Sequence, residues 1–426
     1  MSTEPTLFVG IDWATEEHAI CVLNAEGSVV EERTIEHSGT AIHRFAEHLA
    51  ELTPDGPSSV AIAIEIPRGA LVETLIERGF RLFALNPKQL DRFRDRFFPS
   101  GAKDDSKDAY VLAHSLITDR SCYREAVVDS PGVIALREHI RMHEDLKQER
   151  NRLTNRLRDL LVRYFPDLLR VASDADEPWL LELLERAPTP SQAARLRVGT
   201  VAKLLKSHRI RRLDPLDVVT ALRAPPLELA DGSVDAASTH VLMLIPRIRL
   251  VQQQARDVKK TLGRLLAELA PADDDEHRRE HRDVDIILSL PGAGTIVTAT
   301  MLGEAAQAIQ ERSYTALRAH AGVAPVTKQT GKAKHGKGTR RRPRVIMRHG
   351  CNGRLRNALY NWARVAAQRD AASQRYYARL RTRGHTHGRA LRSVADRLLR
   401  ILFAMLRDGS LYDGSRFDEP VQQEAA

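Results

Sequence analysis

Four carboxylates stand at positions from which a folded chain could bring them together. Asp12 directly follows the apolar run FVGI, and Glu65 closes the apolar run VAIAI. Asp105 and Asp108 are three residues apart, a spacing that places both on one face of a helix. Converging carboxylates repel one another unless a cation lies between them. Mg²⁺ is the expected cofactor, because it prefers oxygen ligands and can clamp the attacking and leaving oxygens of a phosphodiester displacement.

Each acid also has an ordinary structural explanation. An Asp at a strand end or a helix start is usually a turn or N-cap residue, and this applies to Asp105 in particular. Asp104 lies one turn before Asp108 and could replace Asp105 in the same role. A GID strand followed by a hairpin also opens sugar-kinase and actin-like ATPases, but the sequence shows no second phosphate-binding hairpin. The set of acids, more than any single one, therefore indicates metal-dependent chemistry.

The elements that must position these acids follow from the apolar periodicity. Residues 7–35 alternate apolar runs with a glycine-containing turn, which predicts consecutive antiparallel strands. VAIAI and RLFALN predict two further strands, each preceded by a helical pattern, and helical patterns follow to about residue 118. This order is that of an α/β RNase H-like fold. The first strand and VAIAI are neighbours in that topology, so Asp12 and Glu65 are expected at one end of the sheet.

The middle of the chain is predicted to be helical from about residue 133, with an apolar seam in its second half. Its two series, offset by three residues, are Val241, Ile248, Ala255, Leu262 and Leu269, and Leu244, Val251, Val258 and Leu265. A repeat of seven residues predicts a coiled coil. The partner helix belongs either to the same chain or to a second copy, and the sequence favours neither. Pro246 either kinks this helix or marks its start. The acidic stretch 271–285 is interpreted as a solvated linker.

The last third of the chain carries a basic region. No Asp or Glu occurs from residue 312 to residue 369, in a chain of net charge +9. Phosphates would neutralise such a region, so nucleic acid is the expected partner; a solvated basic loop or a targeting signal is the alternative. The predicted nucleic-acid contacts are Lys328, Lys332, Lys334, Lys337, Arg340, Arg341, Arg342, Arg344, Arg348, Arg354 and Arg356.

A Gly-x-Gly turn precedes this region. Gly292 and Gly294 in LPGAG open an apolar helix, like half of a helix-hairpin-helix element, whose backbone N–H groups contact a DNA phosphate. An ordinary loop-to-helix turn has the same pattern. His385 and His387 have no third ligand nearby, so they are expected to be polar surface or phosphate-contact residues and not a metal site.

Bulk properties restrict the class of protein. The 426 residues predict two or three domains, and 42% hydrophobic with 28% charged residues is ordinary for a soluble chain. No apolar run approaches the roughly 18 residues of a membrane span, and the first residues do not resemble a secretion signal. A cytoplasmic protein without a membrane partner is expected. The three cysteines have no spacing typical of zinc or disulfides.

Taken in order, these blocks resemble the DEDD-type insertion-sequence transposases, the "IS one-ten" group that includes the Piv-type invertases. The resemblance covers nearly the whole chain and rests on GIDWA, AIE, KDDSKDAYVLA, LPGAG, AGVAP, QTGK, CNGRLRNALYNWARVA and GHTHGRALR. It implies an RNase H-like (RuvC-like) catalytic domain at residues 1–125 and an α-helical coiled-coil region at 126–280 that assembles a homodimer or tetramer. A mainly α-helical, DNA-binding transposase domain follows at 281–410, and then a flexible tail at 411–426.

The resemblance also implies a reaction. Members cut and rejoin DNA at element ends and targets, with Mg²⁺ held by the residues that correspond to Asp12, Glu65, Asp105 and Asp108, and some are directed by a non-coding guide RNA. A serine before the glycine of QTGK is the family nucleophile; this chain has Thr330 there, with the hydroxyl on a stiffer, β-branched carbon. The other hypotheses are a RuvC-like junction nuclease that uses metal-activated water and an inactive protein that bridges DNA or RNA.

Overall fold

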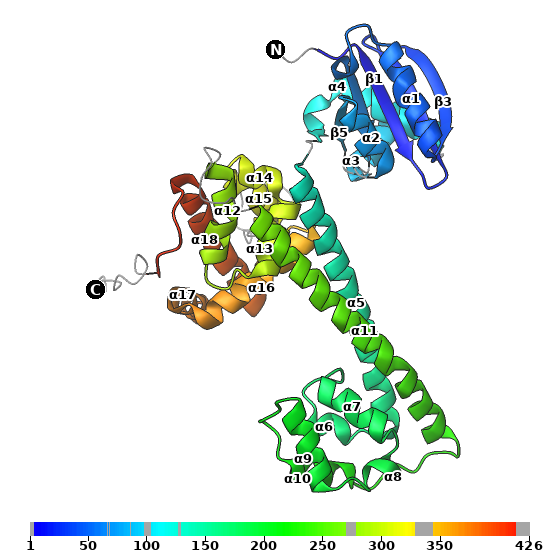
Figure 1. Cartoon of the computed structure of the whole chain (residues 1–426). Coiled ribbons are helices and arrows are strands. Elements are labelled where there is room, and N and C mark those ends of the chain that lie inside the picture. The colour runs from blue at the N-terminus through cyan, green and yellow to red at the C-terminus, as the bar shows by residue number, and fades with distance from the viewer. Residues whose placement is uncertain are drawn as a thin grey trace, which may run out of the picture. The chain divides into compact units, whose positions relative to one another are not determined.

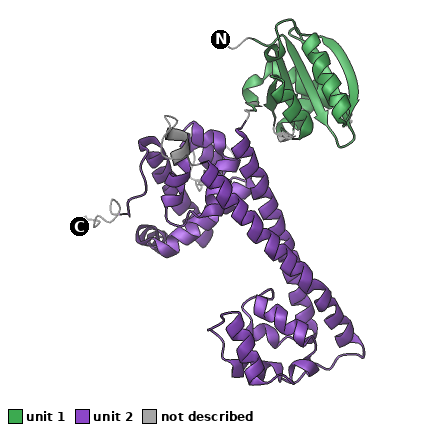
Figure 2. Ribbon diagram, in the orientation of Figure 1, with its two compact units in different colours: residues 1–128 green, residues 129–426 purple. Residues whose placement is uncertain are grey.

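The computed structural model describes residues 4–65, 67, 69–85, 87–97, 104–126, 129–269, 278–328 and 344–414. The chain divides into two compact units, Met1–Val128 and Asp129–Ala426 (Figure 2). Each unit has hydrophobic clusters of its own, two in the first and two in the second. Each unit is therefore organised around its own buried apolar side chains.

Unit 1 is built on a six-stranded mixed sheet in the order β3-β2-β1-β4-β5-β6 (Figure 1). The strands are β1 (Leu7–Trp13), β2 (Glu17–Asn24), β3 (Val29–Glu36), β4 (Val60–Ile64), β5 (Arg81–Ala84) and β6 (Arg124–Glu125). β1 to β3 form an antiparallel meander, β4 is parallel to β1 and β5, and β6 is antiparallel to β5. The predicted order of strands and helices is confirmed; β6 is an addition, too short to show a periodic pattern.

Helices cover both faces of this sheet. They are α1 (Gly39–Glu51), α2 (Ala70–Glu77), α3 (Pro87–Phe97) and α4 (Asp105–Thr118), with 3-10 turns at Pro57–Ser59 and Arg120–Cys122. Because side chains alternate along a strand, Val9 and Ile11 pack with α1 and α2, whereas Phe8 packs with α3 and α4. β4 is buried on both faces, as predicted, with its larger side chains toward α1 and α2 and its alanines toward α4.

Unit 2 is organised by two long helices, α5 (Pro131–Tyr164) and α11 (Ser233–Glu268), which pack together as a hairpin (Figure 1). The buried members of the predicted seam on α11 are Val241, Leu244, Ile248, Val251, Val258 and Leu262. The partner of α11 is thus a helix of the same chain, one of the two arrangements that the sequence left open. α11 begins at Ser233, so Pro246 lies inside the helix and does not mark its start.

Five short helices lie between α5 and α11 in the sequence and form a lobe at one end of the hairpin (Figure 1). They are α6 (Leu168–Val171), α7 (Pro178–Arg186), α8 (Pro190–Ala193), α9 (Val198–Ser207) and α10 (Pro215–Leu222). Trp179 and Tyr164 are almost fully buried in the core that this lobe shares with α5 and α11. The Tyr164 hydroxyl donates to the Pro188 carbonyl at 2.8 Å, which satisfies its one polar group.

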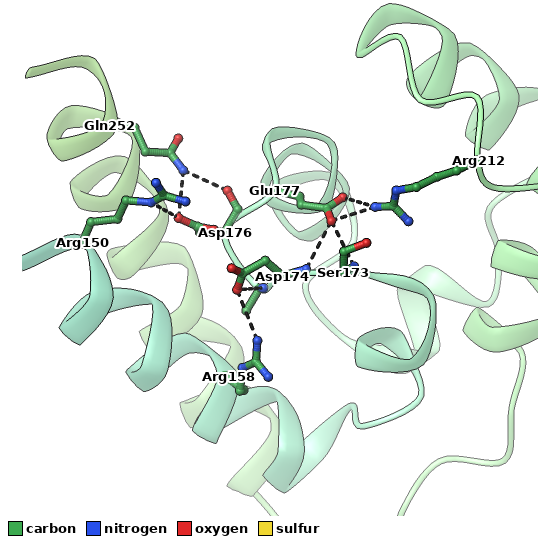
Figure 3. A network of polar contacts seen from close by, with 9 residues as sticks. Arg150, Arg158, Ser173, Asp174, Asp176, Glu177, Arg212 and Gln252 are labelled. Atoms are coloured by element: carbon green, nitrogen blue, oxygen red, sulfur yellow. Dashed lines mark hydrogen bonds and ion pairs between the residues drawn. The ribbon is translucent and has the colours of Figure 1, made fainter. Parts of the chain in front are cut away.

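A polar network ties this lobe to the hairpin (Figure 3). Asp176, which is 3% exposed, accepts hydrogen bonds from Arg150 Nε on α5 at 2.5 Å and from Gln252 Nε2 on α11 at 3.1 Å. Burial would raise the pKa of Asp176, but the hydrogen bond and charge of Arg150 outweigh it and lower that pKa below its usual value. Beside it, Glu177 accepts from Arg212 at 2.5 Å. The segment that contains Asp176 and Glu177 therefore binds side chains from α5, from α11 and from the lobe itself.

The remainder of unit 2 is a helical bundle with a small β-hairpin. Its helices are α12 (Arg278–Ser289), α13 (Thr295–Glu304), α14 (Ala306–Gln310), α15 (Tyr314–His320), α16 (Gly353–Arg369), α17 (Ala371–Thr382) and α18 (His387–Asp408). β7 (Val326–Lys328) pairs antiparallel with β8 (Arg344–Ile346). The core contains Trp362 from α16 and Leu399 from α18, both fully buried. None of the helices in the described ranges has the length and apolar character that a membrane span requires.

The prediction of a solvated linker over residues 271–285 is wrong for its second half. Residues 270–277 lie outside the described part, and α12 begins at Arg278. Asp283 is 5% exposed and accepts from both terminal nitrogens of Arg312, at 2.6 and 2.9 Å. Val284 beside it is 4% exposed. The local charge density concealed the helix, because Asp283 is paired with a residue 29 positions further along the chain.

Candidate active site and nucleic-acid interface

Asp12 and Glu65 occupy neighbouring positions of the sheet. The parallel pair β1–β4 places Ile11 opposite Ile64, and Asp12 and Glu65 are the next residue on each chain segment. Alternation along the strands directs both carboxylates toward the face that carries α3 and α4. Both residues are half-buried. The structure thus brings together two acids that are far apart in the sequence.

Gly10 lets α4 approach this edge of the sheet. A Cβ atom on Gly10 would lie only 1.9 Å from the carbonyl oxygen of Ala109 and 2.6 Å from the amide nitrogen of Ala113, so no other residue fits there without moving the helix. Asp108 precedes Ala109. The close approach therefore carries the third acid toward the end of β1 that bears Asp12.

Asp108 is buried and paired with an arginine. Its side chain is 3% exposed and accepts from Arg94 Nε at 2.5 Å and from Arg94 Nη2 at 2.7 Å. The hydrogen bond to Asp108 raises the pKa of Arg94, although partial burial opposes it, and the negative charges of Asp108, Asp91 and Asp12 add to the rise. Arg94 of α3 is thus a positive charge on which both Asp108 and Asp12 act.

The beginning of α4 separates the three consecutive acids by role. Asp104 is the N-cap: its side chain accepts from the amide of Ser106 at 3.1 Å, and it forms an ion pair with Lys107 at 3.8 Å. The N-cap role that was considered for Asp105 therefore belongs to Asp104. Asp105 is the first residue of the helix and is exposed. Of the two acids expected on one face, Asp108 is the one buried in the fold.

The carboxylates are the kind of ligand that a hard divalent cation prefers, but their spacing in this structure is not that of a metal-binding group. Among the described residues, no three His, Cys, Asp or Glu side chains form a group that could hold a metal ion. The donors beside Arg94 are nonetheless carboxylates, which Mg²⁺ prefers, and buried Asp108 already has a cationic partner. A metal ion at Asp108 would take the place of the Arg94 guanidinium.

The predicted nucleophile belongs to the connection between β7 and β8. Lys328 is paired with Arg344, so this connection leaves the hairpin at that end. The predicted site residues that lie outside the described part are Thr330, Lys332, Lys334, Lys337, Arg340, Arg341 and Arg342, together with the side chains of Lys328 and Arg344. The structure therefore locates both ends of the segment that contains Thr330.

Three predicted nucleic-acid contacts lie close to the start of α16. Arg348 Nε donates to the Gly350 carbonyl at 3.2 Å, and Arg356 Nη1 donates to Cys351 Sγ at 3.7 Å. Arg354 Nε is buried and has no hydrogen-bond partner among the described residues. None of these arginines forms an ion pair with a carboxylate in the described ranges. Their charges remain available to an anion.

The two glycines of LPGAG differ in their surroundings. Gly292 has φ = +80°, and a Cβ there would lie 3.0 Å from the Ala366 amide nitrogen on α16, so its small size serves packing inside the protein. Gly294 is the exposed N-cap of α13, and a Cβ atom there would meet nothing within 4 Å. The Trp362 indole donates to the Pro291 carbonyl at 3.0 Å and holds this turn. Of the pair, Gly294 is the one that an external phosphate could reach.

Sequence reasoning did not single out Arg94. It stands in the charged run DRFRDRF, whose alternation of signs is typical of a solvated helix face. Only the fold shows that Arg94, unlike its exposed neighbours Arg92 and Asp95, turns toward a buried carboxylate. The nearest available signal was the unexplained charge of Asp108 inside an otherwise apolar helix face.

Comparison with known proteins shows what the chain is similar to. A family model described as "Transposase", of the DEDD type, matches residues 9–166, and one described as "Transposase IS116/IS110/IS902 family" matches residues 284–378. "Mini-circle putative transposase for IS117" of Streptomyces coelicolor is 31% identical over 432 residues, which cover 99% of each chain. An insertion element IS110 protein of 43.6 kDa from the same organism is 27% identical over 96% of this chain and 95% of its own.

A further relative matches more strongly over a shorter region. "Putative transposase y4uE" of Sinorhizobium fredii is 50% identical over 216 residues, which are 50% of this chain and 60% of that protein. The α/β unit with its acids, the helical second unit and these matches define the class of the protein, a DNA transposase. More narrowly, the chain belongs to the IS116/IS110/IS902 family of insertion-sequence transposases.

Proposed function

We propose that this transposase cuts and rejoins DNA with Mg²⁺ held by Asp12, Glu65, Asp105 and Asp108 and with the hydroxyl of Thr330 as nucleophile. One observation carries the proposal. Asp12 and Glu65 lie in register on neighbouring parallel strands, on the sheet face against which α4 brings the buried Asp108. Carboxylates that converge repel one another unless a cation lies between them, and Mg²⁺ is a cation that prefers such oxygen ligands.

An RNase H-like, RuvC-like fold for the first unit is part of this proposal. An antiparallel meander β3-β2-β1 continued by the parallel strands β4 and β5 supports it, with helices on both faces. The finer division into a catalytic domain at 1–125, a coiled-coil region at 126–280 and a basic domain at 281–410 is proposed on the same basis. The described hairpin of α5 and α11 and the bundle around α18 are consistent with it.

The chain's own residues prepare the site for the metal. When bound, Mg²⁺ would polarise the scissile phosphate and stabilise the charge of the attacking and leaving oxygens. Asp12 on β1, Glu65 directly after β4 and Asp108 on α4 would each supply an oxygen ligand. The fourth ligand would come from the exposed Asp105 in the first turn of α4. Arg94 keeps the charge of Asp108 compensated before the metal binds.

Thr330 takes the place of the serine in the family pattern. Its oxygen forms the new bond to phosphorus, the bond between phosphorus and the leaving DNA oxygen breaks, and the hydroxyl proton passes to solvent or to the leaving oxygen. The result is a phosphodiester between protein and DNA. Lys328 and Lys332, close to Thr330 in the sequence, are the nearest cations for the developing charge.

Trapping this intermediate tests the proposal. Protein is mixed with element-end DNA, with its guide RNA where the element encodes one, and Mg²⁺, then denatured and separated from free DNA. We expect a covalent adduct from the wild type and from Thr330→Ser, and none from Thr330→Ala or Asp12→Ala. Cleavage by Thr330→Ala at the wild-type rate would instead support a junction nuclease that uses metal-activated water. Tight binding without cleavage in every variant would support a bridging protein.

Assembly through the hairpin is proposed as well. Met243 and Leu250 lie outside the predicted seam, seven residues apart on α11, and are 64% and 57% exposed. An apolar stripe with this spacing fits a second helix. A homodimer or tetramer that binds DNA ends and target, and a guide RNA, is the working complex that we propose.

A further inference from the structure

We propose that a cavity of about 230 Å³ in the second unit binds one phosphate group of a nucleic-acid backbone. It lies between α15, α18 and the residues next to β7 and β8, and its polar lining includes Arg318, His385, Arg389, Arg392, Ser393 and Asp396. Apart from His385, which the sequence predicts to be a polar surface or phosphate-contact residue, none of the residues that line it belongs to the predicted nucleic-acid contacts. The assignment deepens the proposed function, on which it rests, by placing a DNA or RNA strand beside β7 and β8, the strands that the Thr330 segment connects.

The only carboxylate in this lining, among the described residues, is already neutralised. Asp396 accepts from Arg318 Nε at 2.6 Å, from the Tyr314 hydroxyl at 2.6 Å and from Arg400 at 3.3 Å. Arg318 and Arg400 together carry more positive charge than one Asp carries negative charge. Asp396 therefore has no capacity left to compensate further cations in the cavity.

Arg389 and Arg392 are left without a counter-charge. They are three residues apart on one face of α18, at the edge of the cavity. Arg392 is half-buried, and its Nη1 atom meets the thioether sulfur of Met347 at 3.5 Å. In the described part of the chain neither arginine forms an ion pair. A half-buried guanidinium that meets only a weak acceptor is costly unless an anion binds it.

His385 supplies a second, independent sign of a missing acceptor. Its Nδ1 atom is buried and has no hydrogen-bond partner among the described residues, although the side chain lines the cavity. The Arg381 guanidinium holds the backbone here by donating to the His385 carbonyl at 2.8 Å. A phosphate oxygen in the cavity would accept from Nδ1–H and remove this unsatisfied polar group.

A neighbouring cavity of about 240 Å³ indicates a polymer phosphate and not a free ion. The two share Gly322, Val323, Met347 and Arg392, and the second also includes Leu359 and Tyr360. Its apolar lining suits the sugar or base that adjoins a backbone phosphate. Arg392, which borders both cavities, would then hold the phosphate while the attached nucleoside lies beside Tyr360.

The cavity lies beside one end of the β-hairpin. Pro325 and Ile346 place it at the Val326–Ile346 end of the β-hairpin, whereas the connection with Thr330 leaves from the Lys328–Arg344 end. Those ends are about 7 Å apart at the usual rise of a strand. The cavity therefore lies beside the end of the hairpin that is opposite to the Thr330 connection, and in this proposal it positions the strand without taking part in bond making.

Equilibrium binding of the full-length protein tests the proposal. Labelled single-stranded DNA from the element end, and RNA of the same sequence, are titrated in EDTA over a series of salt concentrations. We expect Arg392→Gln and Arg389→Gln each to weaken binding about tenfold, with the slope of log K against log salt reduced by about 0.7 for one lost phosphate contact. Arg392→Lys keeps the slope. Arg407→Gln, on the exposed end of the same helix, is the matched control and binds as the wild type does.

Neutral methylphosphonates identify the phosphate itself. One backbone phosphate of the oligonucleotide is replaced at a time. At one position the replacement should weaken binding by the wild type but should not further weaken binding by Arg392→Gln. Whether this effect occurs with the DNA, with the RNA or with both shows which nucleic acid supplies the phosphate. Unchanged slopes for Arg389→Gln and Arg392→Gln, in variants with wild-type thermal midpoints, would overturn the assignment. EDTA removes catalysis, so this failure is distinct from the absence of a Thr330 adduct.

Discussion

At the scale of single residues, the carboxylate of Asp108 shows how a charged group is kept inside the α/β unit. It is 3% exposed, and the Arg94 guanidinium binds both of its oxygens. A buried charge that loses its partner destabilises a protein far more than an exposed one does. Under the proposed function, a metal ion that binds Asp108 would have to displace the same arginine that stabilises the fold.

Replacing Arg94 separates these two effects. We expect Arg94→Gln to lower the free energy of unfolding by about 3 kcal/mol without metal, because Asp108 is left charged and unpaired. Millimolar Mg²⁺ should then raise the thermal midpoint of the variant more than that of the wild type. Arg92→Gln, an exposed change on the same helix, is the control. Equal Mg²⁺ shifts in all three proteins would show that no cation competes with Arg94.

Gly10 provides a steric test of the same edge. A Cβ atom there would meet the Ala109 carbonyl at 1.9 Å, so Gly10→Ala should cost at least about 2 kcal/mol of unfolding free energy in denaturant titrations. It should also reduce Mg²⁺ binding, since α4 carries Asp108. Gly199→Ala, which has nothing within 4 Å, should stay within about 1 kcal/mol of the wild type. A Gly10→Ala protein of normal stability would contradict the close approach of α4.

At the scale of elements, the turn before α7 joins the lobe to the long hairpin. Asp176 binds Arg150 on α5 and Gln252 on α11 at once, so one acid connects three segments (Figure 3). Packing of apolar residues in the shared core provides most of the stability, and this network adds a fixed orientation. The lobe should therefore loosen when the acid is neutralised.

The lowered pKa of Asp176 determines how its contribution to stability changes with pH. Because its folded pKa lies below the unfolded value of about 3.8, its stabilisation is complete above that pH and is lost as the pH falls through the folded pKa. The stability difference between wild type and Asp176→Asn should be constant from neutral pH to about pH 5 and shrink below about pH 4. Urea unfolding at each pH measures it. Asp159→Asn, exposed on α5, should show no such difference; an Asp176→Asn difference that grows on acidification would refute the assignment.

At the scale of the whole molecule, α11 carries exposed apolar side chains as well as buried ones. The buried members of the seam pack against α5 within the chain, while Met243 and Leu250 are exposed. The hairpin alone therefore does not account for every apolar residue of this helix. A second copy of the chain is the partner that the proposed assembly provides.

Light scattering at micromolar protein tests this assembly. The double variant Met243→Lys and Leu250→Lys should have the mass of one chain, because a lysine pair in the stripe opposes a second helix. The wild type should have the mass of two or four. Leu227→Lys, an equally polar change at an exposed leucine outside α11, should leave the mass unchanged. Identical masses for all three proteins would exclude this stripe as the contact.

Local patterns were sufficient to predict part of this molecule. Apolar alternation determined β1 to β5 and the helices between them, because strand and helix periods are properties of a few adjacent residues. The ends of two such strands then indicated Asp12 and Glu65 as neighbours, and the acid-free run indicated a basic region before any contact was known.

The rest depended on pairs of residues that are distant along the chain. The sequence could not show that α11 packs on α5, that Asp283 finds Arg312 or that Arg94 turns inward to Asp108. Arg389 and Arg392 of α18 were not among the predicted nucleic-acid contacts, and only the fold places them at a cavity whose one described carboxylate is already paired. Periodicity states which residues are buried, whereas the identity of a buried charge's partner is decided only when the tertiary structure brings the two together.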